Sequence, residues 1–339
     1  MENIIYFKKI NSIGGVESWL YYLAKKYEFK VYYKEADAEQ IKRLSQMVEV
    51  HKYKEPIKCD KFFCNYGLDI EVDAKEKYNV IHCDFKNVWF SPIIYEGFKN
   101  IGVSQLACDS YTELTGLECE LMYNPITIDV PKVEKYNDGK LHLISATRLS
   151  REKGLDRMKK LARMLENAGI DYEWVVYTNK HRQPIGNHVI YKDTKLDILE
   201  EIAKADYLVQ LSDCEAFCYT VVESLMCGTP VIATDLPVFK ELGIIHGKNA
   251  VICDLDMKKV DIPMIQEKSL KVAYKPPTSD WGKYLPTERT YNPNELVEVK
   301  TLKKIYLVEE NEHHIRGAKI KLKKWRASYL EAKGWMEIL

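Results

Sequence analysis

Short runs of apolar, β-branched and aromatic residues alternate along the first part of the chain with segments of helical periodicity. Strands are expected at 3–10, 29–33, 48–53, 61–65, 79–84, 101–104 and 120–123, and helices at 16–27 and 38–47. Strands that alternate with helices are typical of a parallel sheet covered on both faces. The pattern therefore predicts an α/β domain at the start of the chain.

The composition changes at 125–140, where two prolines and a polar run that ends in Asp138-Gly139 predict a linker. The alternation then resumes, with strands expected at 141–147, 173–178, 188–191, 207–211, 230–234 and 250–253, and helices at 154–168, 197–204 and 220–227. The chain is thus predicted to form two Rossmann-like, doubly wound domains that face a cleft. The expected parts are 1–124, the linker 125–140, 141–256, a loop-rich connection at 257–294, and a small basic module or crossover segment at 295–339.

Composition sets limits on the function. The 339 residues contain 50 Lys and Arg against 50 Asp and Glu, so the net charge gives no general attraction to nucleic acid or anionic lipid. No run approaches the roughly 18 apolar residues of a spanning helix, and the start lacks a signal-peptide pattern. Most of the nine cysteines have apolar neighbours, which indicates small buried side chains in a reducing compartment. A cytoplasmic protein is expected, free or peripheral at a membrane.

The segment 207–230 carries the main chemical signal. An apolar strand runs into a turn and then into a helix whose first-turn N–H groups favour an anion such as a diphosphate. Glu215 lies in the turn and Glu223 about one turn into the helix. Two carboxylates so placed can accept hydrogen bonds from the hydroxyl pairs of a sugar or a ribose. The alternative for Glu223 is a charge that only complements the helix dipole.

This segment resembles the E-x7-E motif of the GT-B glycosyltransferases, specifically the large retaining family GT4. The resemblance implies that Glu215 contacts the donor sugar and Glu223 the ribose. It also places four intervening residues in the donor-binding loop: Phe217, Cys218, Tyr219 and Thr220. The family usually has glycine where this chain has Cys218, so the approach of the backbone to the donor is expected to differ there.

A second signature follows the first strand of the second domain. Arg148 and Lys153 lie in the segment 146–154, which resembles the family's G-R-L-x-x-x-K-G segment, with Ala146 in place of the usual glycine. A guanidinium and an ammonium at a helix entrance can neutralise a diphosphate and stabilise it as it leaves. Solvated surface cations are the alternative.

Three further residues are candidates through the same resemblance. Gly15 follows the opening strand in a Gly-Gly turn that would let the backbone come close to the donor. His82 ends a strand at the same edge, where the family often has a histidine near the reacting carbon, although a lone histidine is often structural. Glu241 matches an acidic residue of the family, or is a surface charge. Asn179 stands where the family has a glycine-rich turn, so the base pocket is expected to differ.

The end of the chain is outside the resemblance. It contains a basic run without acids, at Arg316, Lys319, Lys321, Lys323, Lys324 and Arg326. This run is either a solvated face or a contact for a phosphate-bearing acceptor, a membrane surface or nucleic acid.

The resemblance therefore implies a retaining, metal-independent glycosyltransferase without a cofactor, with a nucleotide sugar such as UDP-glucose as donor substrate. The expected acceptor is a hydroxyl on a glycan, a lipid-linked molecule or a protein. Two alternatives stay open. One is a phage-type enzyme that glycosylates DNA bases, in the cytoplasm of the host, and the other is a non-catalytic module that binds nucleotide sugars.

Overall fold

The computed structural model describes residues 2–179, 183–307 and 312–339. The first domain contains a seven-stranded sheet in the order β3-β2-β1-β4-β5-β6-β7, and every pairing is parallel. Its strands are β1 (Asn3–Ile10), β2 (Lys30–Ala36), β3 (Glu49–Lys52), β4 (Ile57–Asn65), β5 (Val72–Ile81), β6 (Lys99–Gly102) and β7 (Cys119–Leu121). Its helices are α1 (Gly15–Lys26), α2 (Ala38–Leu44) and α3 (Gln105–Thr115).

The second domain contains a six-stranded parallel sheet in the order β10-β9-β8-β11-β12-β13. Its strands are β8 (Leu141–Ala146), β9 (Tyr172–Thr178), β10 (Val189–Asp193), β11 (Tyr207–Gln210), β12 (Val231–Thr234) and β13 (Ala250–Cys253). Its helices are α4 (Leu155–Asn167), α5 (Leu199–Lys204), α6 (Tyr219–Met226), α7 (Pro237–Glu241) and α8 (Ile262–Glu267). The predicted pair of Rossmann-like domains is confirmed.

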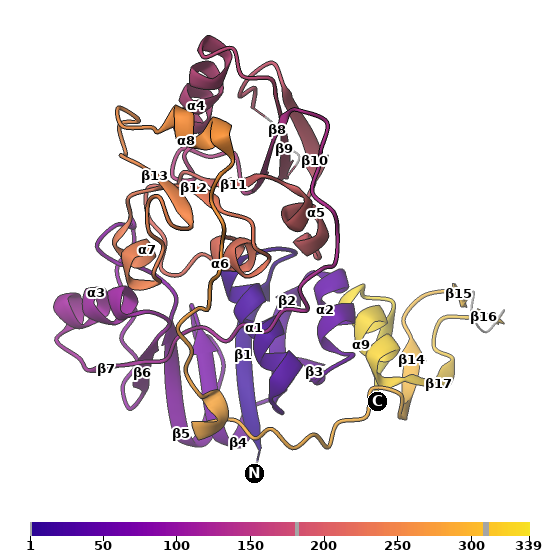
Figure 1. The fold of residues 1–339 in the computed structure, drawn as a ribbon. Coiled ribbons are helices and arrows are strands. Elements are labelled where there is room, and N and C mark those ends of the chain that lie inside the picture. Colours follow the sequence, from indigo (N-terminus) through magenta and orange to yellow (C-terminus); the bar gives the residue numbers. More distant parts are fainter. Residues whose placement is uncertain (1, 180–182, 308–311) are drawn as a thin grey trace.

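Both sheets reverse their strand order at one point, between β1 and β4 in the first and between β8 and β11 in the second. Ligands of open α/β sheets bind in the crevice beyond the carboxyl ends of the strands at such a switch point. Figure 1 shows α6 of the second domain facing α1 of the first, so the two switch points lie on opposite sides of one interdomain region.

One face of the first sheet is covered in part by extended and loop segments instead of a helix. The parallel strands β4 and β5 are joined by residues 66–71, which return along the sheet in extended form without a helix. Leu68 and Ile70 of this return, with Tyr95 and Phe98 of the following loop, pack on a cluster built around Tyr6 and Phe62. The segment 66–71 and the loop that contains Tyr95 and Phe98 therefore cover this face in place of a helix.

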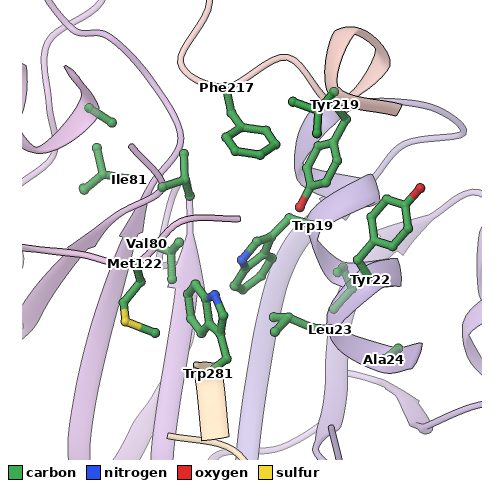
Figure 2. Packing of buried hydrophobic residues seen from close by; sticks show 14 of the residues in the cluster. Trp19, Tyr22, Leu23, Ala24, Val80, Ile81, Met122, Phe217, Tyr219 and Trp281 are labelled. Atoms are coloured by element: carbon green, nitrogen blue, oxygen red, sulfur yellow. The ribbon is translucent and has the colours of Figure 1, made fainter. Parts of the chain in front are cut away.

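After α8 the chain crosses back to the first domain (Figure 1). The short 3-10 helix η1 (Trp281–Lys283) buries Trp281 against Trp19 of α1, with ring centroids 5.6 Å apart. The Trp281 indole N–H donates to the Tyr123 carbonyl at 2.9 Å. Figure 2 shows Trp19 and Trp281 below Phe217 and Tyr219, in a hydrophobic cluster formed by both domains.

The end of the chain forms a small module beside α2 and β3. It consists of an antiparallel sheet, a two-stranded pair and a helix: β14 (Leu296–Thr301), β17 (Lys319–Lys323) and β18 (Met336–Ile338), β15 (Ile305–Leu307) with β16 (Glu312–His314), and α9 (Lys324–Ala332). Ser45 Oγ donates to the Trp325 carbonyl at 3.1 Å, and Ser328 Oγ donates to the Val50 carbonyl at 3.3 Å. The module is therefore attached to the first domain through α9.

Candidate active site

A cleft of about 350 Å³ lies between the domains, where the two switch points face each other. The first domain lines it from α1 and α2 with Ser18, Tyr21, Tyr22, Lys25 and Arg43. The second domain lines it from the ends of β8 and β9, from α6, and from the segment 194–199 before α5, including Arg148, Asn179, Thr220 and Glu223. The cleft thus brings together predicted residues from two strand-to-helix turns.

Glu223 lies in this cleft and is held from the opposite domain. The Tyr22 hydroxyl on α1 donates to Glu223 Oε1 at 2.6 Å, and the Tyr22 ring stacks on Tyr219 at 5.3 Å. Burial raises the pKa of the Glu223 carboxyl, although the hydrogen bond from Tyr22 works in the opposite direction. Glu223 lines the cleft, so a ligand bound there can contact its carboxylate. A carboxylate that only complemented the helix dipole would not need this position.

Cys218 lies immediately before α6 with a φ of 68°, in the left-handed region. Glycine adopts this conformation freely, whereas a residue with a Cβ is strained in it. The backbone at position 218 therefore has the conformation that glycine adopts easily, and this conformation is less favourable for the cysteine that occupies it. Burial raises the pKa of the Cys218 thiol well above its ordinary value, so the side chain is a neutral thiol at neutral pH.

Lys153 and Glu215 form an ion pair across the two turns, with Nζ and Oε1 2.8 Å apart. Only 22% of the Lys153 side chain and 13% of the Glu215 side chain are exposed. The Ser212 hydroxyl and the Gln210 amide also donate to Glu215 Oε1, at 2.7 and 3.1 Å. Burial acts to lower the pKa of Lys153, but the charge of Glu215 and its hydrogen bond raise it overall, so the lysine stays protonated.

Arg148 is more open than this pair. Its side chain is 66% exposed, and its guanidinium lies 3.5 Å from Glu152 at the edge of the cleft. A partly solvated guanidinium on this rim can turn toward an anionic ligand without losing a buried partner.

His82 lies in the first domain and directly follows β5. Its ring Nε2 is 2.6 Å from Asn65 Oδ1, and its ring packs edge-on against Trp19 at 5.1 Å. Burial lowers the pKa of His82 to about 3, so the imidazole is neutral at neutral pH. It can therefore donate or accept a hydrogen bond but does not supply a positive charge.

Three other predicted residues, Gly15, Phe217 and Tyr219, are not among those that line the cleft. Gly15 begins α1, and a Cβ built on it would meet no atom within 4 Å, so space does not demand glycine there. Phe217 and Tyr219 are buried in the cluster between the domains (Figure 2), and the Tyr219 hydroxyl donates to the Pro125 carbonyl at 3.0 Å. These two aromatic residues therefore pack between the domains, and the cleft lining does not include them.

Glu241 lies away from the cleft, and its carboxylate has a different partner. Its oxygens accept hydrogen bonds from the backbone N–H groups of Gln105 and Leu106, at 2.6 and 3.1 Å. Those groups are the first of α3 in the other domain, where a negative charge stabilises the helix end. We therefore assign Glu241 to an interdomain cap and not to the donor site.

None of the first-domain residues that line the cleft was predicted, and Tyr22, Lys25 and Arg43 are among them. Lys25 donates to the Thr127 carbonyl at 3.1 Å, and the Arg43 guanidinium stacks 3.3 Å from the centre of the Tyr21 ring. These residues belong to α1 and α2, and only the way in which the two domains face each other shows that they share a cleft with Glu223. No sequence motif marks them.

Comparison with known proteins finds similarity in one segment and in the fold. Residues 128–260 match the family model described as glycosyl transferases group 1. No curated protein matches the chain. The matched segment covers most of the second domain, and the arrangement of two Rossmann-like domains is the GT-B fold.

Several crystal structures share the fold. HepE of Anabaena, solved with UDP and glucose, has a TM-score of 0.62 and 16% identity, covering 79% of this chain and 89% of HepE. A glycosyltransferase of Rickettsia africae has a TM-score of 0.56 and 13% identity, covering 79% and 88%. WaaG, a glycosyltransferase involved in lipopolysaccharide biosynthesis, has a TM-score of 0.54 and 12% identity, covering 78% and 88%. None of the helices in the described ranges is long and apolar enough to cross a membrane.

Proposed function

We propose that the protein is a retaining, metal-independent glycosyltransferase that moves a sugar from a nucleoside-diphosphate sugar, such as UDP-glucose, to a hydroxyl acceptor. The observation that carries the proposal is the shared position of Glu223, the start of α6 and Arg148 in one interdomain cleft. The Lys153–Glu215 pair joins the turns that follow β8 and β11, although neither residue is among those that line the cleft. HepE, whose fold is similar, binds UDP and UDP-glucose.

Each part of the donor then has a complementary group. The Glu223 carboxylate accepts hydrogen bonds from the ribose hydroxyls, because a carboxylate has room for several donors beside Tyr22. The first N–H groups of α6 and the Arg148 guanidinium bind the diphosphate. Glu215, held by Lys153 and Ser212, presents its second oxygen to a hydroxyl of the transferred sugar.

The chemical step places developing negative charge on the diphosphate oxygen that leaves the sugar. Lys153 and Arg148 stabilise that charge electrostatically, and this is the role that a metal ion has in other transferases. The acceptor oxygen attacks the anomeric carbon from the same face as the leaving group, and its proton passes to the departing phosphate oxygen. His82, which is neutral, orients the acceptor or the sugar by a hydrogen bond.

The basic run near the end of the chain does not favour a nucleic-acid acceptor. Lys324 lies 2.8 Å from Glu295, and Lys319 lies 3.6 Å from Glu298, so their charges are partly neutralised within the module. The module also lies beside α2 and β3, outside the residues that line the cleft.

The proposal is tested with radiolabelled UDP-glucose and GDP-mannose. The measurements are nucleotide release and the incorporation of label into lipid, protein, polymer or DNA of a lysate. Glu215→Gln and Glu223→Gln should reduce turnover by about 10²-fold or more, whereas Glu134→Gln, on the exposed linker, should leave it unchanged. Full turnover by Glu215→Gln would contradict the catalytic assignment. The anomeric configuration of the product, measured by NMR, tests retention.

A further inference from the structure

The loop between β5 and β6 exposes a group of large apolar side chains. Trp89 is 95% exposed, Ile94 57% and Ile93 49%, and Phe90 lies beside them. Scattered apolar residues are common on protein surfaces, but a contiguous group within one short loop marks a binding surface. We call Trp89, Phe90, Ile93 and Ile94 the apolar loop.

An apolar cavity of about 250 Å³ lies beneath this loop. Its walls include Val80 and Ile81 of β5, Phe85, Phe90 and Ile93 of the loop, and Tyr66 at the end of β4. The Phe85 and Phe90 rings meet edge to face at 6.0 Å. The cavity and the apolar loop are therefore one continuous surface, because Phe90 and Ile93 belong to both.

The loop is anchored at both of its ends. The Tyr95 hydroxyl accepts hydrogen bonds from the backbone N–H groups of Gly67 and Leu68, at 3.1 and 2.9 Å. At the start of the loop the Phe85 N–H donates to Ser110 Oγ at 3.1 Å. The exposed apolar side chains thus stand on a fixed frame, so the cavity is formed before any ligand binds.

The cavity adjoins the region where transfer is proposed. Tyr66, with a strained φ of 46°, places its ring 6.0 Å from the His82 ring. Cys214 of the second domain directly precedes Glu215 in the chain. Its thiol donates a hydrogen bond to the Asn87 carbonyl of the same loop at 3.4 Å. The loop therefore reaches from the cavity to the turn that carries the Lys153–Glu215 pair.

The lining identifies the chemical class of the occupant. Apart from Asn79, Ser91 and the hydroxyls of Tyr66 and Tyr95, the lining is apolar, so most sugar hydroxyls placed there would lose their hydrogen bonds to water, which is unfavourable. A hydrocarbon chain gains instead, by about fourfold in affinity for each buried methylene. We propose that the acceptor is an amphiphile, with its hydroxyl head near His82 and Glu215 and its hydrocarbon chain in the cavity and along the apolar loop. This inference rests on the proposed transferase function.

The test uses octyl and methyl β-glucoside, which share a head group and differ in the hydrocarbon chain. Binding to the full-length protein is measured by calorimetry below the micelle concentration of the octyl compound, with UDP present. Octyl glucoside should bind at least about tenfold more tightly than methyl glucoside. Release of UDP from UDP-glucose should also change with octyl glucoside concentration and saturate where binding saturates.

Two exposed positions of the loop provide the variants. Trp89→Ser and Ile94→Asn should each weaken octyl glucoside binding by about fivefold or more, because both replace apolar rim surface with polar groups. Ile315→Asn is the matched control, since Ile315 is 72% exposed but lies in the C-terminal module. It should bind octyl glucoside as the unmodified protein does.

Several results would overturn the inference. They are equal affinity for the two glucosides, an equal loss of octyl glucoside affinity in Ile315→Asn, or a rate of UDP release that does not change when octyl glucoside binds. Failure of the proposed function appears separately. Slow hydrolysis of UDP-glucose without any acceptor tests the donor site alone. If hydrolysis occurs and octyl glucoside does not bind, the transferase proposal stands and the amphiphile proposal is wrong.

Discussion

Replacing Lys153 by methionine separates the chemical role of the Lys153–Glu215 pair from its structural role. The lysine Nζ lies 2.8 Å from Glu215 Oε1, and both side chains are largely buried. Methionine keeps much of the volume of the lysine stem and removes the charge. Glu215 then retains two neutral donors, Ser212 Oγ and Gln210 Nε2.

Two magnitudes follow. Loss of one partner of a buried ion pair costs about 3–5 kcal/mol of stability, and the two remaining donors should keep the cost near about 2 kcal/mol. Loss of a cation that stabilises the departing diphosphate should lower kcat by about 10²–10³. In the double variant with Glu215→Gln, no unpaired charge is left, so stability should return to within about 1 kcal/mol of the original protein while kcat stays low.

The assay combines thermal or denaturant unfolding with release of UDP from UDP-glucose. Lys258→Met is the control, because its ion pair with Asp256 is exposed and far from the cleft, and it should change stability by less than about 0.5 kcal/mol. Recovery of kcat together with stability in the double variant would refute the reasoning, because it would show that the pair only supports the fold.

Three further predictions follow from the same region. Cys218→Gly should be more stable than Cys218→Ala by about 1 kcal/mol. Alanine is usually the more stabilising of the two residues, but the φ of 68° at this position favours glycine. Equal unfolding midpoints for the two variants would contradict this strain. His82 has a pKa of about 3 in the folded protein and about 6.5 when unfolded, so only the unfolded chain takes up this proton as pH falls below 6.5. Stability should therefore decrease from pH 6.5 to 5 by about 1.4 kcal/mol per unit, and His82→Gln should remove that slope in denaturant titrations. Tyr22→Phe removes a hydrogen bond that lowers the Glu223 pKa, so in the variant Glu223 should become protonated at a higher pH. Because a protonated Glu223 binds the donor less well, KM for UDP-glucose should begin to rise at a higher pH than in the original protein. An unchanged pH profile would show that Tyr22 does not control the Glu223 carboxylate.

The sequence was sufficient to predict the second domain and the turns that carry Arg148, Lys153, Glu215 and Glu223. Arg148 and Lys153 lie between β8 and α4, and Glu215 lies between β11 and α6, which contains Glu223. Because β8 and β11 are neighbouring parallel strands, chain order brings these segments to one edge of the sheet. The ion pair between Lys153 and Glu215 was not predicted, because it depends on side-chain placement across two neighbouring turns.

Other features depended on contacts between distant segments. The strands β4 and β5 extend well before the predicted starts at 61 and 79, because polar residues occupy their first halves and hide the strand pattern. Tyr22 reaches Glu223 only through the packing of α1 against α6. Glu241 matched a motif position, yet its local sequence could not show that α3 of the other domain offers it two N–H groups.

The crossing of the chain near Tyr123 has a mechanical consequence. The chain leaves the first domain just after β7 and returns through Ser279 and Trp281, and the two passages touch: the Tyr123 N–H donates to Ser279 Oγ at 2.9 Å, and the Trp281 indole donates to the Tyr123 carbonyl. Two adjacent covalent tethers permit rotation about the line that joins them and resist sliding. A movement that opens the cleft should therefore be a swing of one domain about this crossing.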